Sequence, residues 1–285
     1  MKNKIIQCAL KSGASDIGFL SARTFSELLT PLKADIPFTK TSPYERINPF
    51  SIDKNAKTII VLLFSYKTDT DGNISSYARG KDYHTVLKDI SKPLIALINS
   101  LGYNASFFCD NANLNERFLA REAGLGFIGE NGFLISPEFG SFVFLAHIIT
   151  DLEISPDTPN KDFCMACGKC KNACPTKALS TGDFYSCLSY ITQKKGELSK
   201  SEANLIKKTR MCWGCDICQK VCPHNENVPT TKIPEFSENL ICNLNDIAMS
   251  NKEFKQTYSD RAFSWRGKGV IERNLNIINN PKDIY

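Results

Sequence analysis

CMACGKCKNACP at residues 164–175 and CWGCDICQKVCP at residues 212–223 both follow the pattern C-x2-C-x2-C-x3-C-P. This is the cysteine spacing of bacterial ferredoxins with two [4Fe–4S] clusters, in which the fourth cysteine of each run reaches the neighbouring cluster. Paired C-x2-C units also bind structural zinc, but zinc ligands usually come as separated pairs. An unbroken run that occurs twice therefore favours two clusters and a one-electron relay.

The rest of the chain is much larger than a ferredoxin requires. About 160 of its 285 residues precede the first cysteine run, and about 60 follow the second. Its composition, 42% apolar and 23% charged, is that of an ordinary globular protein, and its net charge of +5 is a modest excess. No apolar run is long enough to span a membrane, and residues 1–20 lack signal-peptide anatomy. Twelve cysteines without an export signal predict metal ligation in a reducing cytoplasm.

Hydrophobic periodicity before the cysteines predicts alternating helices and strands. Helices are expected over residues 3–12, 84–101 and 113–123, and strands over 16–20, 58–66 and 105–109. Residues 133–136 and 141–149 are expected to form a hairpin, whereas residues 30–50, with four prolines, are expected to be irregular. The pattern predicts an α/β or α+β domain over residues 1–155, a cluster domain over 156–232 and a helical extension over 233–285.

Five stretches, the last of them inside the second cysteine run, carry a family resemblance. They are YARGKDYH (77–84), CDNANLNER (109–117) running into AGLGFIGEN (123–131), GSFVFL (140–145) through TDL (150–152), CLSYIT (187–192) and GCDICQ (214–219). In this order around a doubled cluster run, they resemble epoxyqueuosine reductases over roughly residues 12–280. These oxidoreductases depend on cobalamin and two [4Fe–4S] clusters, perform the last step of queuosine synthesis on tRNA, and are related to reductive dehalogenases.

The resemblance implies an α+β protein. An N-terminal α/β cobalamin-binding domain would be followed by a ferredoxin-like two-cluster domain and a short helical C-terminus. The chain departs from the family pattern in two places. It ends shortly after residues 273–280, which resemble the start of the family's C-terminal helical-repeat region, so a short version is expected. Around residues 36–46 the usual motif is different, and only Arg46 and Pro49 match.

The resemblance also implies site residues. Asp110 would be the proton donor, whereas its sequence position alone favours a helix N-cap at Asp110 or Asn111. Glu116 and Arg117 would form an ion pair at the strand-to-helix junction. The implied cobalamin contacts are Tyr77, Arg79, Asp110, Leu134, Leu145, Ser189 and Asp216.

Three glycines and a histidine also bear on the cofactor site. Gly124, Gly126 and Gly129 are compatible with a helix stop and tight turn, or with close backbone approach to a flat macrocycle. His84 is expected to form hydrogen bonds rather than to ligate cobalt, because the resembled family holds cobalamin without a histidine on the metal.

One cluster would be held by Cys164, Cys167, Cys170 and Cys222. The other would take Cys174, Cys215, Cys218 and a fourth ligand. Ferredoxin spacing alone selects Cys212 as that ligand. The resemblance of residues 187–192 to the family's cysteine motif selects Cys187, and this is the assignment that we adopt.

Basic residues suggest the substrate surface. They lie between the cysteine runs (Lys194, Lys195, Lys200, Lys207, Lys208, Arg210) and near the C-terminus (Arg261, Arg266, Lys268, Arg273). Together they suit the phosphates of a tRNA anticodon stem-loop, and Trp213, Trp265 and Tyr258 are candidates either for base stacking or for core packing.

The expected protein is a cytoplasmic monomer that receives electrons from a flavodoxin or ferredoxin and reduces epoxyqueuosine in tRNA. One alternative is a corrinoid iron–sulfur reductase of a small molecule, similar to a reductive dehalogenase. The other is a non-enzymatic electron carrier of the ferredoxin type.

Overall fold

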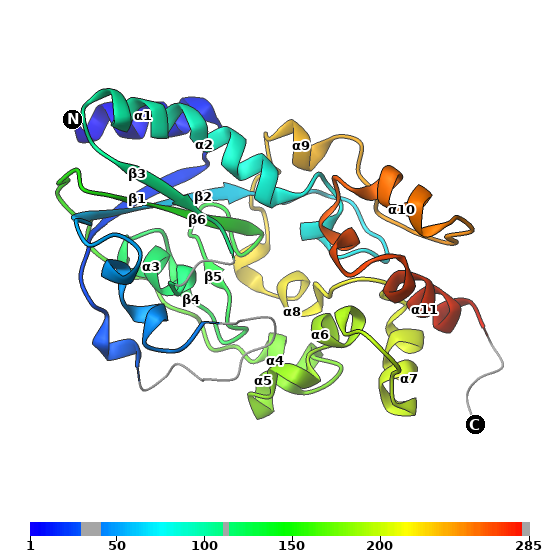
Figure 1. The fold of residues 1–285 in the computed structure, drawn as a ribbon. Coiled ribbons are helices and arrows are strands. Elements are labelled where there is room, and N and C mark those ends of the chain that lie inside the picture. The colour runs from blue at the N-terminus through cyan, green and yellow to red at the C-terminus, as the bar shows by residue number, and fades with distance from the viewer. Residues whose placement is uncertain (30–40, 111–113, 281–285) are drawn as a thin grey trace. The chain divides into compact units, whose positions relative to one another are not determined.

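A computed structural model describes residues 1–29, 41–110 and 114–280 (Figure 1). The chain divides into two compact units, each assembled from two separate segments. The first contains Met1–Ser65 and His84–Ala166, and the second contains Tyr66–Tyr83 and Cys167–Tyr285. This division differs from the linear boundaries expected from the sequence, since residues 66–83 join the cysteine-rich part and residues 233–285 are not a separate unit.

The first unit is built around a four-stranded sheet with strand order β1-β2-β6-β3. The strands are β1 (Asp16–Ser21), β2 (Thr58–Ser65), β3 (Ala105–Phe108) and β6 (Val143–Thr150). β2 is the predicted buried strand, and all eight of its residues are buried because both faces of the sheet are covered. All three strand pairings are antiparallel, so the unit is α+β and the α/β description of this part is wrong.

Helices cover both faces of this sheet. α1 (Lys2–Ser12) and α2 (Tyr83–Ser100) lie on one face, and α3 (Glu116–Glu122) lies on the other (Figure 1). α1 ends at Gly13, whose φ of 116° places it in the left-handed region that favours glycine. The three helices confirm the expected ones, although α3 is shorter than predicted. Short 3-10 helices complete the unit: η1 (Ser26–Leu28), η2 (Glu45–Ile47) and η3 (Pro49–Ser51).

The predicted hairpin between residues 133–136 and 141–149 is largely wrong. β5 (Leu134–Ile135) pairs with β4 (Phe127–Ile128) in a two-stranded ribbon, and a single bridge, Ser136 to Gly140, closes the turn between the two expected strands. Gly126 permits this pairing because it has φ 155° and a Cβ there would meet Ile135 O at 2.2 Å. Gly124 has φ 82° directly after α3. These glycines therefore serve helix termination and close packing of the protein's own backbone.

The second unit consists of short helices and loops. Its helices are α4 (Lys169–Ala173), α5 (Ala178–Thr181), α6 (Leu188–Gln193), α7 (Lys200–Thr209), α8 (Ile217–Lys220), α9 (Pro234–Ser237), α10 (Asn251–Tyr258) and α11 (Lys268–Asn279). Its 3-10 helices are η4 (Ser76–Ala78), η5 (Phe184–Ser186), η6 (Pro223–Asn225) and η7 (Ala262–Arg266). α7 and α10 each begin with a capping box, Ser199 with Glu202 and Ser250 with Glu253, which satisfies free N–H groups at the helix start.

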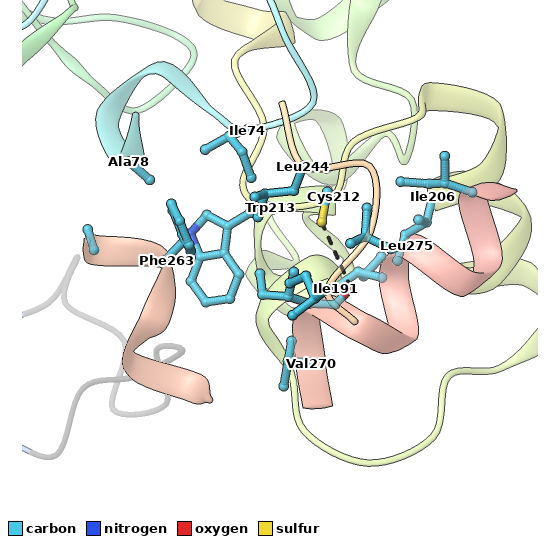
Figure 2. Close-up of a cluster of buried hydrophobic side chains, with 14 of the residues drawn as sticks. Ile74, Ala78, Ile191, Ile206, Cys212, Trp213, Leu244, Phe263, Val270 and Leu275 are labelled. Atoms are coloured by element: carbon cyan, nitrogen blue, oxygen red, sulfur yellow. Dashed lines mark hydrogen bonds between the residues drawn. The ribbon is translucent and has the colours of Figure 1, made fainter. Parts of the chain in front are cut away.

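An apolar cluster centred on Trp213 holds the second unit together (Figure 2). Trp213 and Phe263 are fully buried there, together with Ile271 of α11. The segment 66–83 is attached to this cluster by a parallel bridge between Ile74 and Trp213 and by a hydrogen bond from Ser75 N to Trp213 O (2.8 Å). This long-range pairing explains why the segment belongs to the second unit. Within the described part of the chain, no helix has the length and apolar character needed to cross a membrane.

Candidate redox centre and acid residue

Four cysteines of the second unit lie close together. Burial, followed by the neighbouring thiols of Cys187 and Cys174, raises the pKa of Cys215 to about 12. Burial also raises the pKa of Cys218, with further contributions from Cys215, Cys187, Cys174 and Cys170. Interactions between charges weaken as the distance between them grows. The thiols of Cys174, Cys187, Cys215 and Cys218 therefore lie near one another, with Cys170 also near Cys218, and four thiolates are the donor type and number required by a [4Fe–4S] cluster.

Three short elements bring these sulfurs together. Cys174 directly follows α4, Cys187 directly precedes α6, and Cys215 and Cys218 flank the start of α8. α4 packs against α8. Burial alone would raise the pKa of Cys174, but hydrogen bonds from the Thr176 hydroxyl and from nearby backbone N–H groups lower it. Such bonds stabilise a thiolate, the form that binds iron.

Cys212 has a different environment. Its side chain is fully buried inside the apolar cluster, between Trp213 and the helix that carries Leu275 (Figure 2). Its Sγ lies 4.0 Å from Ile271 O. Burial raises the pKa of Cys212 to about 12, and no other cysteine of the described chain contributes to that shift. Cys212 therefore has the surroundings of a small apolar core residue.

The other predicted cluster ligands span the boundary of the two units. Cys167 is exposed, whereas Cys170 and Cys222 are each 8% exposed, and all three belong to the second unit. Cys164 is partly buried near the end of the first unit. Among the described residues, no three His, Cys, Asp or Glu side chains are grouped as ligands of a single ion would be. In a [4Fe–4S] cluster each thiolate binds a different iron, so the cysteine ligands lie further apart than the ligands of a single metal ion.

Arg79 and Asp216 form a buried network beside the second cysteine run. Their side chains are 1% and 3% exposed, and Arg79 Nη2 lies 4.0 Å from Asp216 Oδ2. Arg79 Nε also donates to Ile74 O (2.7 Å). Asp216 accepts from Ser75 Oγ and from Ser76 N (2.7 Å) and Ser76 Oγ (2.8 Å). The network fixes the loop between Cys215 and Cys218 to the segment 66–83.

The predicted cobalamin contacts are divided between the units. Asp110, Leu134 and Leu145 belong to the first unit, and Tyr77, Arg79, Ser189 and Asp216 belong to the second. Leu134, Arg79 and Asp216 are buried within their own units.

Two of the remaining predicted contacts have polar partners in the second unit. Tyr77 is partly exposed, and its hydroxyl accepts from Trp213 Nε1 (2.8 Å). Ser189 is also partly exposed, and its Oγ accepts from Gln193 Nε2 (3.1 Å).

Asp110 stands on a left-handed turn directly after β3. Its φ is 59°, its side chain is 54% exposed, and its Oδ2 lies 3.4 Å from His84 Nε2. Its backbone N–H donates to Glu116 Oε1 (2.7 Å). Asn115 caps α3 by accepting from Phe118 N (3.2 Å), so the N-cap interpretation of Asp110 is wrong. Asn111, the other predicted cap, lies outside the described residues.

Glu116 has a partner that the sequence analysis missed. Its Oε1 lies 3.6 Å from Nδ1 of His147, a fully buried residue of β6. Burial raises the pKa of Glu116, and His147 opposes that shift. The predicted ion pair between Glu116 and Arg117 is absent from the described residues, and Arg117 Nη1 donates to Gly132 O instead. The register of β3 against β6, which pairs Phe108 with His147, is the signal that reveals this contact.

The predicted nucleic-acid surface is only partly available. Arg273 donates to the carbonyls of Lys194 (2.8 Å) and Gly196 (2.6 Å), and Arg261 donates to Arg79 O (3.1 Å), so both arginines hold the second unit together. Lys194 pairs with Glu202. The exposed basic side chains of the predicted set include Lys195, Lys200, Lys208 and Arg210.

Of the predicted stacking residues, one is accessible on the surface. Trp213 is a core residue, and Tyr258 packs against Phe254 and Phe263. Trp265 is 54% exposed and lies under the Arg266 guanidinium, 3.8 Å from the ring centre.

Two family models match this chain. Residues 163–225 match a 4Fe-4S double cluster binding domain, and residues 46–111 match the model described as epoxyqueuosine reductase QueG, DUF1730. The first match contains all eight proposed cluster ligands, and the second contains Tyr77, Arg79 and Asp110.

Named relatives and solved structures match almost the whole chain. Epoxyqueuosine reductases from Lactococcus garvieae and Staphylococcus aureus are 34% and 35% identical over 96% of this chain, which spans 85% and 78% of their lengths. The structure of epoxyqueuosine reductase from Streptococcus thermophilus has a TM-score of 0.87 and 33% identity, covering 98% of this chain and 80% of that one.

A further structure is that of an epoxyqueuosine reductase with a tyrosine tRNA stem loop modified with epoxyqueuosine. It has a TM-score of 0.89 and 32% identity, covering 97% of this chain and 80% of that one. Identity above 30% over nearly the whole chain, with the same fold and a double-cluster domain, places this chain in the epoxyqueuosine reductase family of oxidoreductases.

Proposed function

We propose that this chain reduces epoxyqueuosine to queuosine at the wobble position of tRNA. One solved structure carries the proposal. It shows an epoxyqueuosine reductase with an epoxyqueuosine-modified tRNA stem loop, and it aligns with 97% of this chain. The grouped thiols of the second unit support the proposal, because removal of an epoxide oxygen to leave an alkene requires two electrons, which iron–sulfur clusters deliver singly.

Two [4Fe–4S] clusters, held by these cysteines, would supply those electrons. The first takes Cys164, Cys167, Cys170 and Cys222, and the second takes Cys174, Cys187, Cys215 and Cys218. The proximity of Cys187 to Cys174 and Cys215 supports its assignment. The placement of Cys212 inside the apolar cluster supports leaving it unligated, since its sulfur faces a carbonyl and hydrocarbon rather than other thiols. An external flavodoxin or ferredoxin supplies the electrons.

Cobalamin, when bound, supplies the two-electron reduction of the carbon–oxygen bond. Tyr77, Ser189, Leu145 and Asp110 are the partly or largely exposed members of the set that would hold it, and they include hydroxyl and carboxyl groups suited to its polar edge. Arg79 and Asp216 fix the backbone of the segments that carry Tyr77 and the second cysteine run.

Asp110 provides the proton for the departing oxygen. Its carboxyl is accessible, and the His84 imidazole at 3.4 Å is placed to return a proton to it after each turnover. Overall, the epoxide takes up two electrons and two protons, one from Asp110 and one from solvent, and its oxygen leaves as water. The exposed basic residues of α7 and Trp265 contact the anticodon stem-loop, and the enzyme acts as a monomer in the cytoplasm, where its tRNA substrate is found.

The test compares tRNA with a small molecule as substrate. The protein is reconstituted anaerobically with iron, sulfide and cobalamin, and purified again to remove unbound corrin. A retained corrin absorption band and turnover of epoxyqueuosine-containing tRNA are expected. Absence of a retained corrin band would favour the electron carrier. A retained band with turnover of an organohalide and none of the tRNA would favour the small-molecule reductase.

A further inference from the structure

We propose that Glu116 and His147 form a positioning pair that holds Asp110 in the backbone conformation from which it donates its proton. This inference rests on the proposed role of Asp110. Neither residue needs to touch the substrate or a cofactor, because both act through the Asp110 backbone. All of the contacts that support the pair lie within the first unit.

The sheet places His147 beside the Asp110 turn. β3 and β6 are antiparallel, and their register puts Phe108 directly opposite His147. The two rings stack with centroids 5.3 Å apart and an interplanar angle of 21°. β3 ends at Phe108, so the chain turns at Asp110 only two residues beyond the stacked pair. The position of the imidazole is therefore fixed by strand pairing and by stacking.

Glu116 links this imidazole to the turn. Its Oε1 accepts the Asp110 N–H at 2.7 Å and lies 3.6 Å from His147 Nδ1. The side chains of Glu116 and His147 are 15% and 1% exposed, so water screens the pair poorly. Within the described residues, neither ring nitrogen of His147 has a hydrogen bond, which leaves Glu116 as its polar neighbour. A buried carboxylate held by a histidine is a fixed acceptor for the turn.

The turn requires such an acceptor. Asp110 has φ 59°, a left-handed conformation that aspartate adopts more readily than most residues with a Cβ but that still needs support from its surroundings. The hydrogen bond to Glu116 supplies that restraint. Without it, the backbone can relax to an extended conformation, which redirects the carboxyl. A misplacement of about 1 Å can lower a rate by about a hundredfold, so the restraint matters for proton transfer.

The first experiment compares substitutions of Glu116 in the reconstituted holoenzyme. We expect Glu116→Ala to slow single-turnover reduction by about 10- to 100-fold with unchanged KM for tRNA, because the carboxyl is misplaced rather than removed. Glu116→Gln should retain most of the activity, since its amide oxygen can still accept the Asp110 N–H. His147→Phe, which keeps the stacked ring but removes Nδ1, should have a smaller effect than Glu116→Ala.

Asn115→Ala is the matched control. Asn115 caps the same helix through Phe118 N, so its loss destabilises α3 without removing the acceptor of the Asp110 N–H. We expect near-wild-type turnover from this variant. Equal losses in Asn115→Ala and Glu116→Ala would overturn the proposal, because the loss would then come from helix stability.

A double-mutant cycle tests whether Glu116 acts through Asp110. In an Asp110→Asn background, Glu116→Ala should cause little further loss. The same fold-loss in both backgrounds would overturn the proposal. Amide hydrogen exchange gives a readout that does not depend on activity: exchange at Asp110 should accelerate in Glu116→Ala and stay slow in Glu116→Gln. If exchange at Asp110 is unchanged in both Glu116 variants, the proposed positioning pair is wrong even if the enzyme is active. An inactive wild-type protein would instead count against the proposed function alone.

Discussion

Arg79 and Asp216 form a buried ion pair, with Nη2 and Oδ2 4.0 Å apart, that connects the segment 66–83 to the second cysteine run. Both side chains are almost inaccessible to solvent, and both have additional hydrogen bonds to the backbone or to serine hydroxyls. A charge in such a place is tolerated only while its partner remains. The pair therefore determines whether the loop around Cys215 keeps its position.

Loss of Asp216 should destabilise the second unit. Asp216→Ala leaves the Arg79 guanidinium buried without its carboxylate, and removal of one partner of a buried pair typically costs about 3–5 kcal/mol. We expect a lower urea midpoint for loss of the cluster absorbance. Asp246→Ala, at an exposed position of the same unit, is the control and should leave the midpoint unchanged. Equal midpoints for Asp216→Ala and wild type would contradict the structural role.

Cys187 and Cys212 should respond differently to substitution. Cys187→Ser should lose one of the two clusters, seen as halved iron content and a simplified EPR spectrum, because Cys187 lies among the grouped thiols. Cys212→Ser should keep both clusters, although it places a hydroxyl in an apolar core and should lower stability by about 1–3 kcal/mol. Retention of both clusters by Cys187→Ser, with loss of one in Cys212→Ser, would reverse the assignment.

Asp110→Asn should slow turnover without changing cofactor binding. The amide cannot donate a carboxyl proton, so turnover should fall by about 10²–10⁴-fold, the usual contribution of a general acid. Iron content and bound cobalamin should match those of wild type. Because Asn115 caps α3, helix capping would not account for such a loss. Near-wild-type turnover would leave Asp110 without a catalytic role.

Binding of the anticodon stem-loop should depend on salt. For each phosphate neutralised, log K should fall by about 0.7–0.9 per log unit of salt. Lys208→Glu and Arg210→Glu, at exposed positions of the predicted surface, should weaken binding and make this dependence shallower. Lys252→Glu, exposed on α10, is the charge-matched control. A stem-loop affinity that does not change with salt concentration, or equal affinities for all three variants, would contradict the proposed tRNA surface.

Trp265 should contribute to stem-loop binding by stacking. Trp265→Ala should weaken binding by about 1–3 kcal/mol if one base stacks on the exposed indole. Phe184→Ala removes another exposed aromatic side chain of the second unit and serves as the control. A stem-loop affinity of Trp265→Ala equal to that of the control would exclude Trp265 from the interface.

The strongly patterned elements of this protein could be predicted from its sequence. The run over 58–66 is apolar at almost every position, so β2 was expected as a buried strand. The expected hairpin failed because residues 134–135 are too short a segment for periodicity to select a partner, and Gly126 allows the ribbon with β4 instead.

Contacts between segments that are distant along the chain could not be predicted from this sequence alone. The attachment of residues 66–83 to Trp213 depends on the pairing of segments that are distant along the chain. The partnership of Glu116 with His147 likewise follows from strand register. Cysteine spacing alone selected Cys212, whereas the fold buries that residue among apolar side chains.

Nucleoside analysis of tRNA after a single turnover shows directly whether the protein reduces epoxyqueuosine. The reconstituted protein, with both clusters and cobalamin loaded, is mixed with epoxyqueuosine-containing tRNA and a low-potential reductant under anaerobic conditions. We expect conversion of epoxyqueuosine to queuosine, seen as the loss of one oxygen atom from the nucleoside, in wild type and much more slowly in Asp110→Asn. Unchanged epoxyqueuosine with the fully loaded wild-type protein would contradict the proposed function.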